Sequence, residues 1–174
     1  MPSQTRWGIW YLRIYRPHKG PVNPDNFSNE IMKLKDKQQD SINNLAFLWC
    51  DEMNIVFQEC VFVSEPSSRK GYGENGAALL CQKIANNLNQ INGSSCLERH
   101  IEVLFSKYGG DRTQQKHLDS IRVINEDLII GKNVWLLDDI TTTGNTLMAC
   151  KKLLKEAGAL EVKCSALCLS QKYI

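Results

Sequence analysis

Two adjacent aspartates, Asp138 and Asp139, follow an apolar run in the stretch NVWLLDDITTTGNTL, which covers residues 133–147. Neighbouring carboxylates repel each other, so a pair at the end of a buried strand implies a partner that both can bind. Carboxylates are strong acceptors for vicinal sugar hydroxyls, and a nearby Mg²⁺ would reduce the repulsion between them. We therefore predict that this pair holds the hydroxyls of a sugar.

The turn behind the aspartates has the composition of a phosphate-binding loop. Its members are Thr142, Thr143, Gly144, Asn145 and Thr146. Glycine lets the backbone curl so that several N–H groups point inward, and the following helix adds the positive end of its dipole. The plainer interpretation is that one threonine caps the helix while the aspartates are solvated. That explains neither the two acids nor the four threonines around one glycine, so the stretch predicts a site for a ribose 5-phosphate.

Strands and helices alternate along the chain, and these elements must position the acid pair and the turn of residues 133–147. Short apolar runs predict strands at residues 60–63, 102–105, 134–137 and 162–169. Apolar residues at helical spacing predict helices over residues 77–88 and 147–157. This order is typical of an α/β domain with a mainly parallel sheet flanked by helices. In such sheets ligands bind at the carboxyl ends of the strands, where the two aspartates stand.

The amino-terminal part of the chain has a different character. Helices are predicted over residues 28–37 and 42–52, and we expect residues 1–54 to form a small helical and aromatic hood over a core of residues 55–174, within one domain. Basic and aromatic residues interleave over residues 6–19, as they do in proteins that bind single-stranded nucleic acid. The alternative is a strand and lid that cover the core, and the near-neutral net charge of +2 favours it.

Charge balance and cysteine content narrow the class of protein. The chain has 21 lysines and arginines against 19 acids, which argues against a strongly basic nucleic-acid binder. No apolar run approaches the ~18 residues that a membrane span needs, and no signal peptide is visible. Seven cysteines without a framework spacing fit the reduced thiols of a cytosol. We therefore expect a cytoplasmic protein with no membrane partner.

The run VWLLDDITTTGNT resembles the signature of type I phosphoribosyltransferases, which bind phosphoribosyl pyrophosphate (PRPP). It differs at Trp135 and Thr141, where that family usually has aliphatic residues. The resemblance implies the type I phosphoribosyltransferase fold and Mg²⁺-dependent displacement of pyrophosphate from C1 of PRPP by a nitrogen nucleophile. It further implies that Asp138 and Asp139 hold the ribose hydroxyls at the catalytic centre, with Mg²⁺ arriving indirectly beside Asp138 on PRPP. The turn over residues 142–146 would hold the 5-phosphate.

The resemblance also assigns the pyrophosphate end of the substrate. Ser68, Arg69 and Lys70 stand in the loop after the first predicted strand, where pyrophosphate binds in the family. The polar run over residues 106–122 would be a cover that closes on PRPP, with Lys107 or Arg112 reaching the pyrophosphate. For both segments a plain solvated loop stays open as the alternative.

Three further segments are similar to the ComF subgroup, the phosphoribosyltransferase-like proteins associated with competence. They are PSSRKGYGEN ahead of an amphipathic helix, the run RTQQ that starts at Arg112, and the pair Arg122 and Asn125. ComF proteins often carry an amino-terminal cysteine zinc motif, and this sequence has none. Relatives in the wider family are commonly dimers, so a homodimer is the assembly that the resemblance implies.

The sequence leaves the acceptor unidentified. Purine salvage enzymes of the family often have an aspartate two positions before the signature glycine, and this chain has Thr142 there. His18, His100 and His117 are isolated in the sequence, which is typical of surface or core positions. Two alternatives remain: a PRPP or nucleotide sensor that contacts nucleic acid, and a Mg²⁺-binding phosphoryl-transfer domain. The second lacks the lysine of a P-loop.

Overall fold

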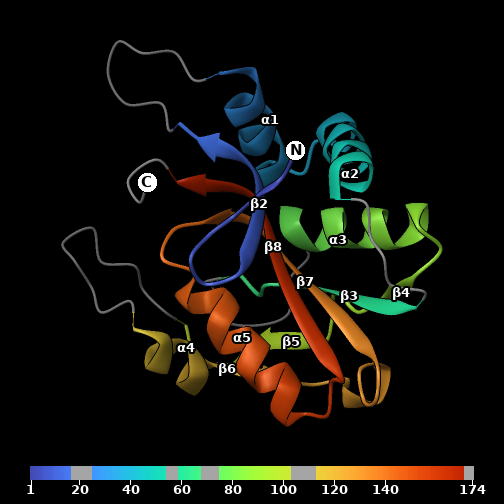
Figure 1. The fold of residues 1–174 in the computed structure, drawn as a ribbon, viewed down its shortest axis with the longest axis vertical. Coiled ribbons are helices and arrows are strands. Elements are labelled where there is room, and N and C mark those ends of the chain that lie inside the picture. The colour runs from blue at the N-terminus through green and yellow to red at the C-terminus, as the bar shows by residue number, and fades with distance from the viewer. Residues whose placement is uncertain (17–24, 54–58, 68–74, 103–112, 171–174) are drawn as a thin grey trace.

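The computed structural model describes residues 1–16, 25–53, 59–67, 75–102 and 113–170. A six-stranded sheet runs through the molecule in the order β1-β2-β8-β7-β3-β4, with helices on both faces (Figure 1). Its strands are Ser3–Gln4 (β1), Ile9–Tyr15 (β2), Cys60–Ser64 (β3), Ile91–Asn92 (β4), Asn133–Thr141 (β7) and Glu161–Ser170 (β8). All neighbouring strands in it are parallel except β1 and β2. The predicted α/β class with a mainly parallel sheet is therefore confirmed.

Helices and a small second sheet complete the described chain. The helices are Asn26–Lys35 (α1), Gln39–Met53 (α2), Gly76–Asn87 (α3), Gln114–Ser120 (α4) and Asn145–Glu156 (α5), with a 3₁₀ turn at Glu126–Leu128 (η1). The second sheet pairs Leu97–Arg99 (β5) with Ile121–Val123 (β6) in antiparallel fashion.

Alternating side chains of the central strands divide the core between the two faces of the main sheet. In β3, Phe62 packs into a cluster with residues of α1, α2 and α3, whereas Val61 and Val63 pack into a second cluster with residues of α5. Trp49 of α2 anchors the first cluster, with edge-on contacts to Phe62 at 5.5 Å and to Trp135 of β7 at 5.4 Å between ring centroids. Strands buried on both faces explain the near-continuous apolar runs in the sequence.

The aromatic and basic segment near the amino terminus contributes a strand to the main sheet. β2 lies parallel to β8, with Ile9 opposite Cys164 and Tyr15 opposite Ser170. Ile9 and Leu12 are buried, so β2 covers the core. This agrees with the interpretation of residues 6–19 as a strand that covers the core. β2 thus belongs to the main sheet, while α1 and α2 pack above it.

Several predicted boundaries differ from the structure. α1 begins at Asn26, ahead of the predicted residue 28, because the carboxylate of Asp25 caps the helix by accepting a hydrogen bond from the N–H of Ser28 at 2.7 Å. Of the strand predicted at residues 102–105, Glu102 lies outside any strand and residues 103–105 lie outside the described residues. The described residues just before it contain β5, a strand of three residues that is too short to give a periodic signal.

Two further observations bear on the composition of the chain. No helix in the described part of the chain is long and apolar enough to cross a membrane. All seven cysteines are free thiols, and all except the half-buried Cys50 are buried. Cys164 and Cys168 of β8 lie in the core, where they act as small apolar side chains.

Candidate functional site

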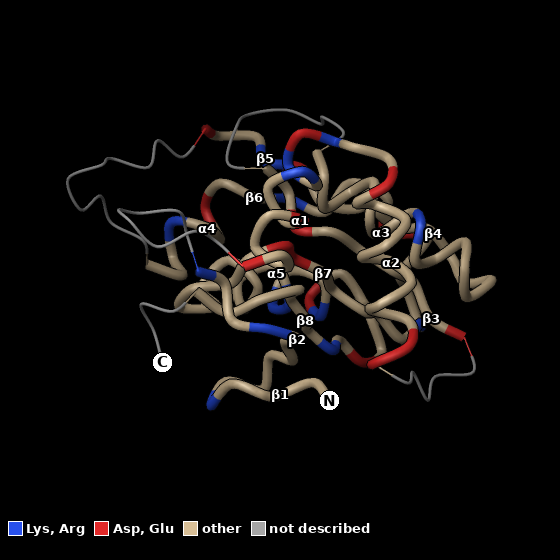
Figure 2. The backbone as a smooth tube through the Cα atoms, turned by 90° about the horizontal axis from the view of Figure 1, so that it is seen from above, with Lys and Arg blue, Asp and Glu red and all other residues tan. Residues whose placement is uncertain are grey.

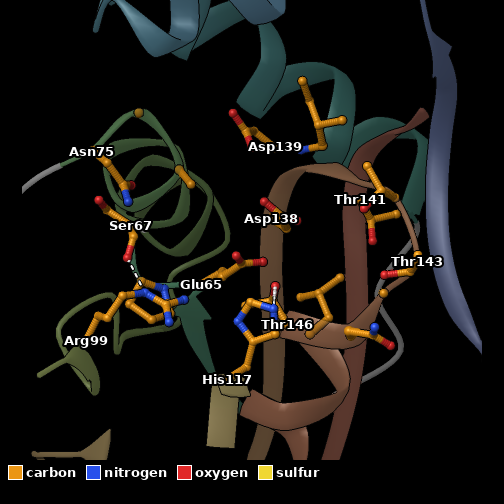
Figure 3. A pocket seen from close by; sticks show the side chains of 18 of the residues that line it. Glu65, Ser67, Asn75, Arg99, His117, Asp138, Asp139, Thr141, Thr143 and Thr146 are labelled. Atoms are coloured by element: carbon orange, nitrogen blue, oxygen red, sulfur yellow. Dashed lines mark hydrogen bonds between the residues drawn. The ribbon is translucent and has the colours of Figure 1, made fainter. Parts of the chain in front are cut away.

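A cavity of about 540 Å³ opens at the carboxyl ends of β3 and β7 (Figure 3). Its volume lies within the range of small-molecule sites. The ends of the two strands, the turn from Thr141 to Leu147 and the start of α3 line it, together with side chains from α1, β5 and α4. The structure therefore brings the predicted acid pair and the predicted phosphate turn to one cavity at the expected edge of the sheet.

The two aspartates at the end of β7 occupy different environments. Asp138 is buried, with 9% of its surface exposed, whereas Asp139 is partly exposed. The carboxylate of Asp139 accepts a hydrogen bond from the N–H of Ile140 at 2.8 Å, and its Oδ2 lies 3.5 Å from Nζ of Lys35 at the end of α1. Burial opposes the charge of Lys35, but Asp139 and Asp138 outweigh it and raise the pKa of the lysine. α1 thus supplies a cation to the acid pair.

A third carboxylate, Glu65, stands beside the aspartates and was missed in the sequence. It follows β3 directly, and its peptide N–H donates to the carbonyl of Leu137 at 2.8 Å, so the ends of β3 and β7 are held together there. Burial is the largest cause that raises the pKa of Glu65, to about 7, and the charge of Asp139 adds to it. Burial, Glu65 and Asp139 together raise the pKa of Asp138 well above its usual value. The cavity floor therefore has an excess of acid groups.

Oxygen atoms at this floor are ready to accept from a ligand. Among the described residues, Oε2 of Glu65 is buried without a hydrogen-bond partner. Buried polar atoms are normally paired, so an unpaired carboxylate oxygen that lines a cavity indicates a missing donor or cation. The signal for Glu65 was available in the sequence: it is an acid directly behind a buried strand, in the same position as the aspartates behind β7.

The phosphate turn is built around Gly144, which has a φ of +77°. The dihedral angle favours glycine, and a Cβ atom at this position would lie 2.5 Å from Cδ1 of the fully buried Ile9 in β2 and would displace that methyl group. Gly144 is itself the N-cap of α5, and no side chain caps this end of the helix. The alternative in which a threonine caps the helix is therefore not what the structure shows.

Two buried side chains from the β5–α4–β6 region reach the same cavity. His117 of α4 is 3% exposed, and its Nε2 lies 3.3 Å from Oγ1 of Thr146. Arg99 of β5 is 1% exposed; its Nε donates to the carbonyl of Ser67 and its Nη1 to Oγ of Ser120, both at 2.7 Å. Burial first, then Arg99 and Lys116, lower the pKa of His117 to about 4, so the imidazole is neutral at pH 7. Burial likewise lowers the pKa of Arg99.

Neither residue stands in a motif or a periodic pattern that the sequence reveals. His117 was interpreted as an isolated surface or core histidine, and Arg99 belongs to a strand too short to recognise. The residues predicted for the pyrophosphate end lie outside the described residues: Ser68, Arg69, Lys70, Lys107 and Arg112. Ser67 and Asn75, which border the first of these segments, both line the cavity. Asn75 also caps α3 by accepting from the N–H of Ala78 at 2.8 Å.

The carboxylates that line the cavity meet the needs of a Mg²⁺ ion that arrives with a ligand. Among the described residues, no group of three or more His, Cys, Asp or Glu side chains is arranged to hold a metal ion by itself. Mg²⁺ keeps several waters and is usually bound through one or two carboxylates together with substrate phosphates. Asp138 and Glu65 provide carboxylate oxygens of this kind, so the residues fit an ion that arrives with a phosphorylated ligand.

The sequence matches the family described as phosphoribosyl transferase domain over residues 74–173, more than half of the chain. The chain therefore belongs to this family. No curated protein sequence matches the chain.

Solved structures agree with this family at the level of the fold. Adenine phosphoribosyltransferase from Leishmania tarentolae aligns with a TM-score of 0.50 and 15% identity, over 94% of this chain and 85% of that one. The enzyme from Giardia lamblia, complexed with 9-deazaadenine, aligns with a TM-score of 0.50 and 18% identity, over 86% and 75%. Glutamine PRPP amidotransferase from B. subtilis aligns with a TM-score of 0.50 and 16% identity, over 72% of this chain. This chain spans only 25% of the amidotransferase.

Proposed function

We propose that this protein is a Mg²⁺-dependent phosphoribosyltransferase that moves the 5-phosphoribosyl group of PRPP to a nitrogen acceptor and releases pyrophosphate. One observation carries the proposal: the acid pair and the threonine-rich turn line a single cavity at the carboxyl edge of the parallel sheet. Membership of the phosphoribosyl transferase domain family supports an enzyme of this class.

Each part of the cavity has a role in this reaction. Asp138 and Asp139 accept hydrogen bonds from the ribose hydroxyls, and the turn over residues 142–146 holds the 5-phosphate with backbone N–H groups, hydroxyls and the start of α5. When pyrophosphate leaves, the ribosyl centre becomes cation-like, and the acid groups at the floor stabilise that charge more than they stabilise the neutral sugar. The site thus favours the transition state over the bound substrate.

The residues proposed to bind pyrophosphate are assigned from the resemblance of the sequence to type I phosphoribosyltransferases. Ser68, Arg69 and Lys70 are assigned to the departing pyrophosphate, with Lys107 and Arg112 as further cations. Fixed positive groups there stabilise the charge that develops on the leaving group, and one such donor is typically worth roughly 10²–10³ in rate. The hydrogen bond from Arg99 to the carbonyl of Ser67 supports this assignment, because it fixes the residue directly ahead of that loop.

Mg²⁺ belongs to the proposal as a cofactor that Asp138 and Glu65 accommodate together with PRPP. When bound, it neutralises part of the charge on the pyrophosphate and on the neighbouring carboxylates.

The remaining assignments concern the acceptor and the organisation of the protein. We assign a nucleobase-like nitrogen nucleophile, a cytoplasmic location and a homodimer. We also assign a single domain in which α1 and α2 of the amino-terminal segment, residues 1–54, form the hood over residues 55–174, while β2 of that segment joins the main sheet. α1 of the hood supplies Lys35 to the cavity, which supports this division. The segments that resemble ComF proteins support a position near that subgroup within the family.

A sensor that binds PRPP without turnover is the second candidate. The observation that favours it is the stacking of the Arg6 guanidinium over the exposed ring of Trp7, at 4.5 Å from the ring centroid, which is a contact surface suited to a nucleobase. Elsewhere, Figure 2 shows Lys and Arg interspersed with Asp and Glu along the described part of the chain. The enzyme is therefore the preferred proposal.

The test is the release of pyrophosphate from PRPP and Mg²⁺ over a panel of nucleobases and amines. Asp138→Asn and Asp139→Asn should each lower kcat/KM by roughly 10²-fold, because each removes a carboxyl group that holds the ribose hydroxyls beside the ribosyl centre. Asp51→Asn, which changes an exposed acid of α2, is the matched control and should behave as the unmodified protein. PRPP binding without turnover, coupled to altered affinity for DNA or RNA, would support the sensor. Unchanged PRPP affinity in the Asp138→Asn, Asp139→Asn double variant would exclude both.

A further inference from the structure

A chain of hydrogen bonds joins the two ends of the cavity through residues that the proposed reaction does not use directly. Arg99 donates to the carbonyl of Ser67 at one end and to Oγ of Ser120 at 2.7 Å. The hydroxyl of Ser120 donates to the carbonyl of His117 at 3.3 Å, and the ring of His117 contacts the hydroxyl of Thr146 at 3.3 Å. The loop after β3 and the phosphate turn before α5 are therefore linked within the protein (Figure 3).

The direction of the last hydrogen bond depends on which ring nitrogen of His117 carries the proton. Nε2 faces Thr146, whereas Nδ1 is buried without a partner among the described residues. A proton on Nδ1 would leave an unpaired buried N–H, and orphaned buried donors are rarer than orphaned acceptors. This favours a proton on Nε2 and a bare Nδ1.

This assignment determines what the hydroxyl of Thr146 can offer. If Nε2–H donates to Oγ1, the hydrogen of the hydroxyl remains available to a ligand in the cavity that Thr146 lines. In the opposite tautomer the hydroxyl would donate to the ring, and only a lone pair would face the ligand. A lone pair repels a phosphate oxygen, whereas a hydroxyl hydrogen binds it.

On the basis of the proposed function, we infer that His117 is a positioning residue for the 5-phosphate: as the Nε2–H tautomer it donates to Thr146 and so turns the hydroxyl of that threonine toward the phosphate. Its partners Arg99 and Ser120 fix the helix that carries it. His117 thus contributes to recognition of the 5-phosphate from outside the phosphate turn, and it has no part in binding pyrophosphate.

The first arm of the experiment measures affinity for ribose 5-phosphate and for pyrophosphate in three proteins. His117→Leu removes the donor, and His117→Gln restores an N–H near the place of Nε2. We expect His117→Leu to bind ribose 5-phosphate about tenfold more weakly, because one donor to a charged group is lost. His117→Gln should regain most of that affinity, and pyrophosphate binding should stay unchanged in both variants. Equal ribose 5-phosphate affinity in all three proteins, or equal losses for both ligands, would overturn the inference.

The second arm measures the unmodified protein, and a variant is needed only to assign the His117 signals. Nitrogen-15 NMR of histidine, with the His117 signals assigned by their disappearance in His117→Gln or in a second variant, His117→Asn, should show a bare Nδ1 and a protonated Nε2 at neutral pH. The reverse pattern would refute the assignment. If the unmodified protein binds neither ribose 5-phosphate nor PRPP, the proposed function fails as well, whereas binding by the unmodified protein with no effect of His117→Leu removes only the inference.

Discussion

Three carboxylates meet at the cavity floor, and Lys35 is the cation that the described structure pairs with one of them. Such a cluster is unfavourable in the free protein, because burial and mutual repulsion raise the pKa of Glu65 and of Asp138. The unfavourable energy is relieved when hydroxyl donors or a cation enter. Residues of this kind stabilise a ligand at the expense of the unliganded fold.

The free energy of unfolding should depend on pH because ionised Glu65 is unfavourable in the folded protein without a ligand. Its pKa is about 7 in the folded protein and near 4.5 when unfolded, so its contribution to stability is fully present below pH 4.5 and lost as the pH rises through 7. Glu65→Gln cannot ionise and keeps its contribution. We therefore expect the free energy of unfolding of Glu65→Gln, relative to the unmodified protein, to rise by about 1–3 kcal/mol between pH 4.5 and pH 8.

Urea unfolding at a series of pH values measures this difference. Glu126→Gln, which changes an exposed acid in η1, is the control and should give a curve parallel to that of the unmodified protein. A parallel curve for Glu65→Gln would mean that Glu65 ionises in the folded protein as freely as in the unfolded one.

At the scale of elements, the site depends on a close approach between β2 and the turn before α5. Gly144 meets the buried Ile9 of β2, so a strand from the amino terminus forms the back of the phosphate turn. The strands of the core and the turn itself were predictable from the sequence because apolar runs and the two acids are local signals. The contact between Ile9 and Gly144 was not, since the two residues are brought together only by the pairing of β2 with β8.

Substituting Gly144 separates the effect of space from the effect of the dihedral angle. Gly144→Ala should lower the free energy of unfolding by about 2–4 kcal/mol, because a left-handed alanine is strained and its Cβ meets Ile9. Gly131→Ala is the matched control: it has a φ of +70° with no atom within 4 Å of the added Cβ, so it should cost only about 1 kcal/mol. Chemical unfolding gives both values, and PRPP affinity should fall only in Gly144→Ala. Similar losses of stability in the two variants would show that the turn relaxes around the added methyl group.

At the scale of the whole molecule, residues distant in sequence meet at one edge of the sheet. Lys35 comes from α1, Glu65 follows β3, Arg99 belongs to β5 and His117 to α4. Their roles were not predictable because each stands alone in the sequence, whereas the aspartates and the turn form one continuous motif. The sequence therefore predicted the acid pair and the threonine-rich turn, which line the cavity, and the structure supplied the polar floor that surrounds them.

Ligand binding should stabilise the fold, because a ligand of this cavity binds the folded protein and not the unfolded chain. At a PRPP concentration of one hundred times Kd with Mg²⁺ present, the gain is about 2.7 kcal/mol. For a chain of this size that corresponds to a rise in Tm of roughly 5–10 °C. Calorimetry with and without PRPP measures the shift, and the Asp138→Asn, Asp139→Asn double variant should show little of it. An unchanged Tm of the unmodified protein would contradict the proposed site.

The pairing of β2 with β8 has a consequence for biosynthesis. Residues 9–15 leave the ribosome long before residues 161–170, yet the parallel neighbour that buries Ile9 and Leu12 is made of those later residues. At translation rates of about 5–20 residues per second, roughly 7–30 s pass before the partner strand of β2 has been synthesised. The phosphate turn, whose glycine rests against Ile9, can reach its final shape only after that wait ends.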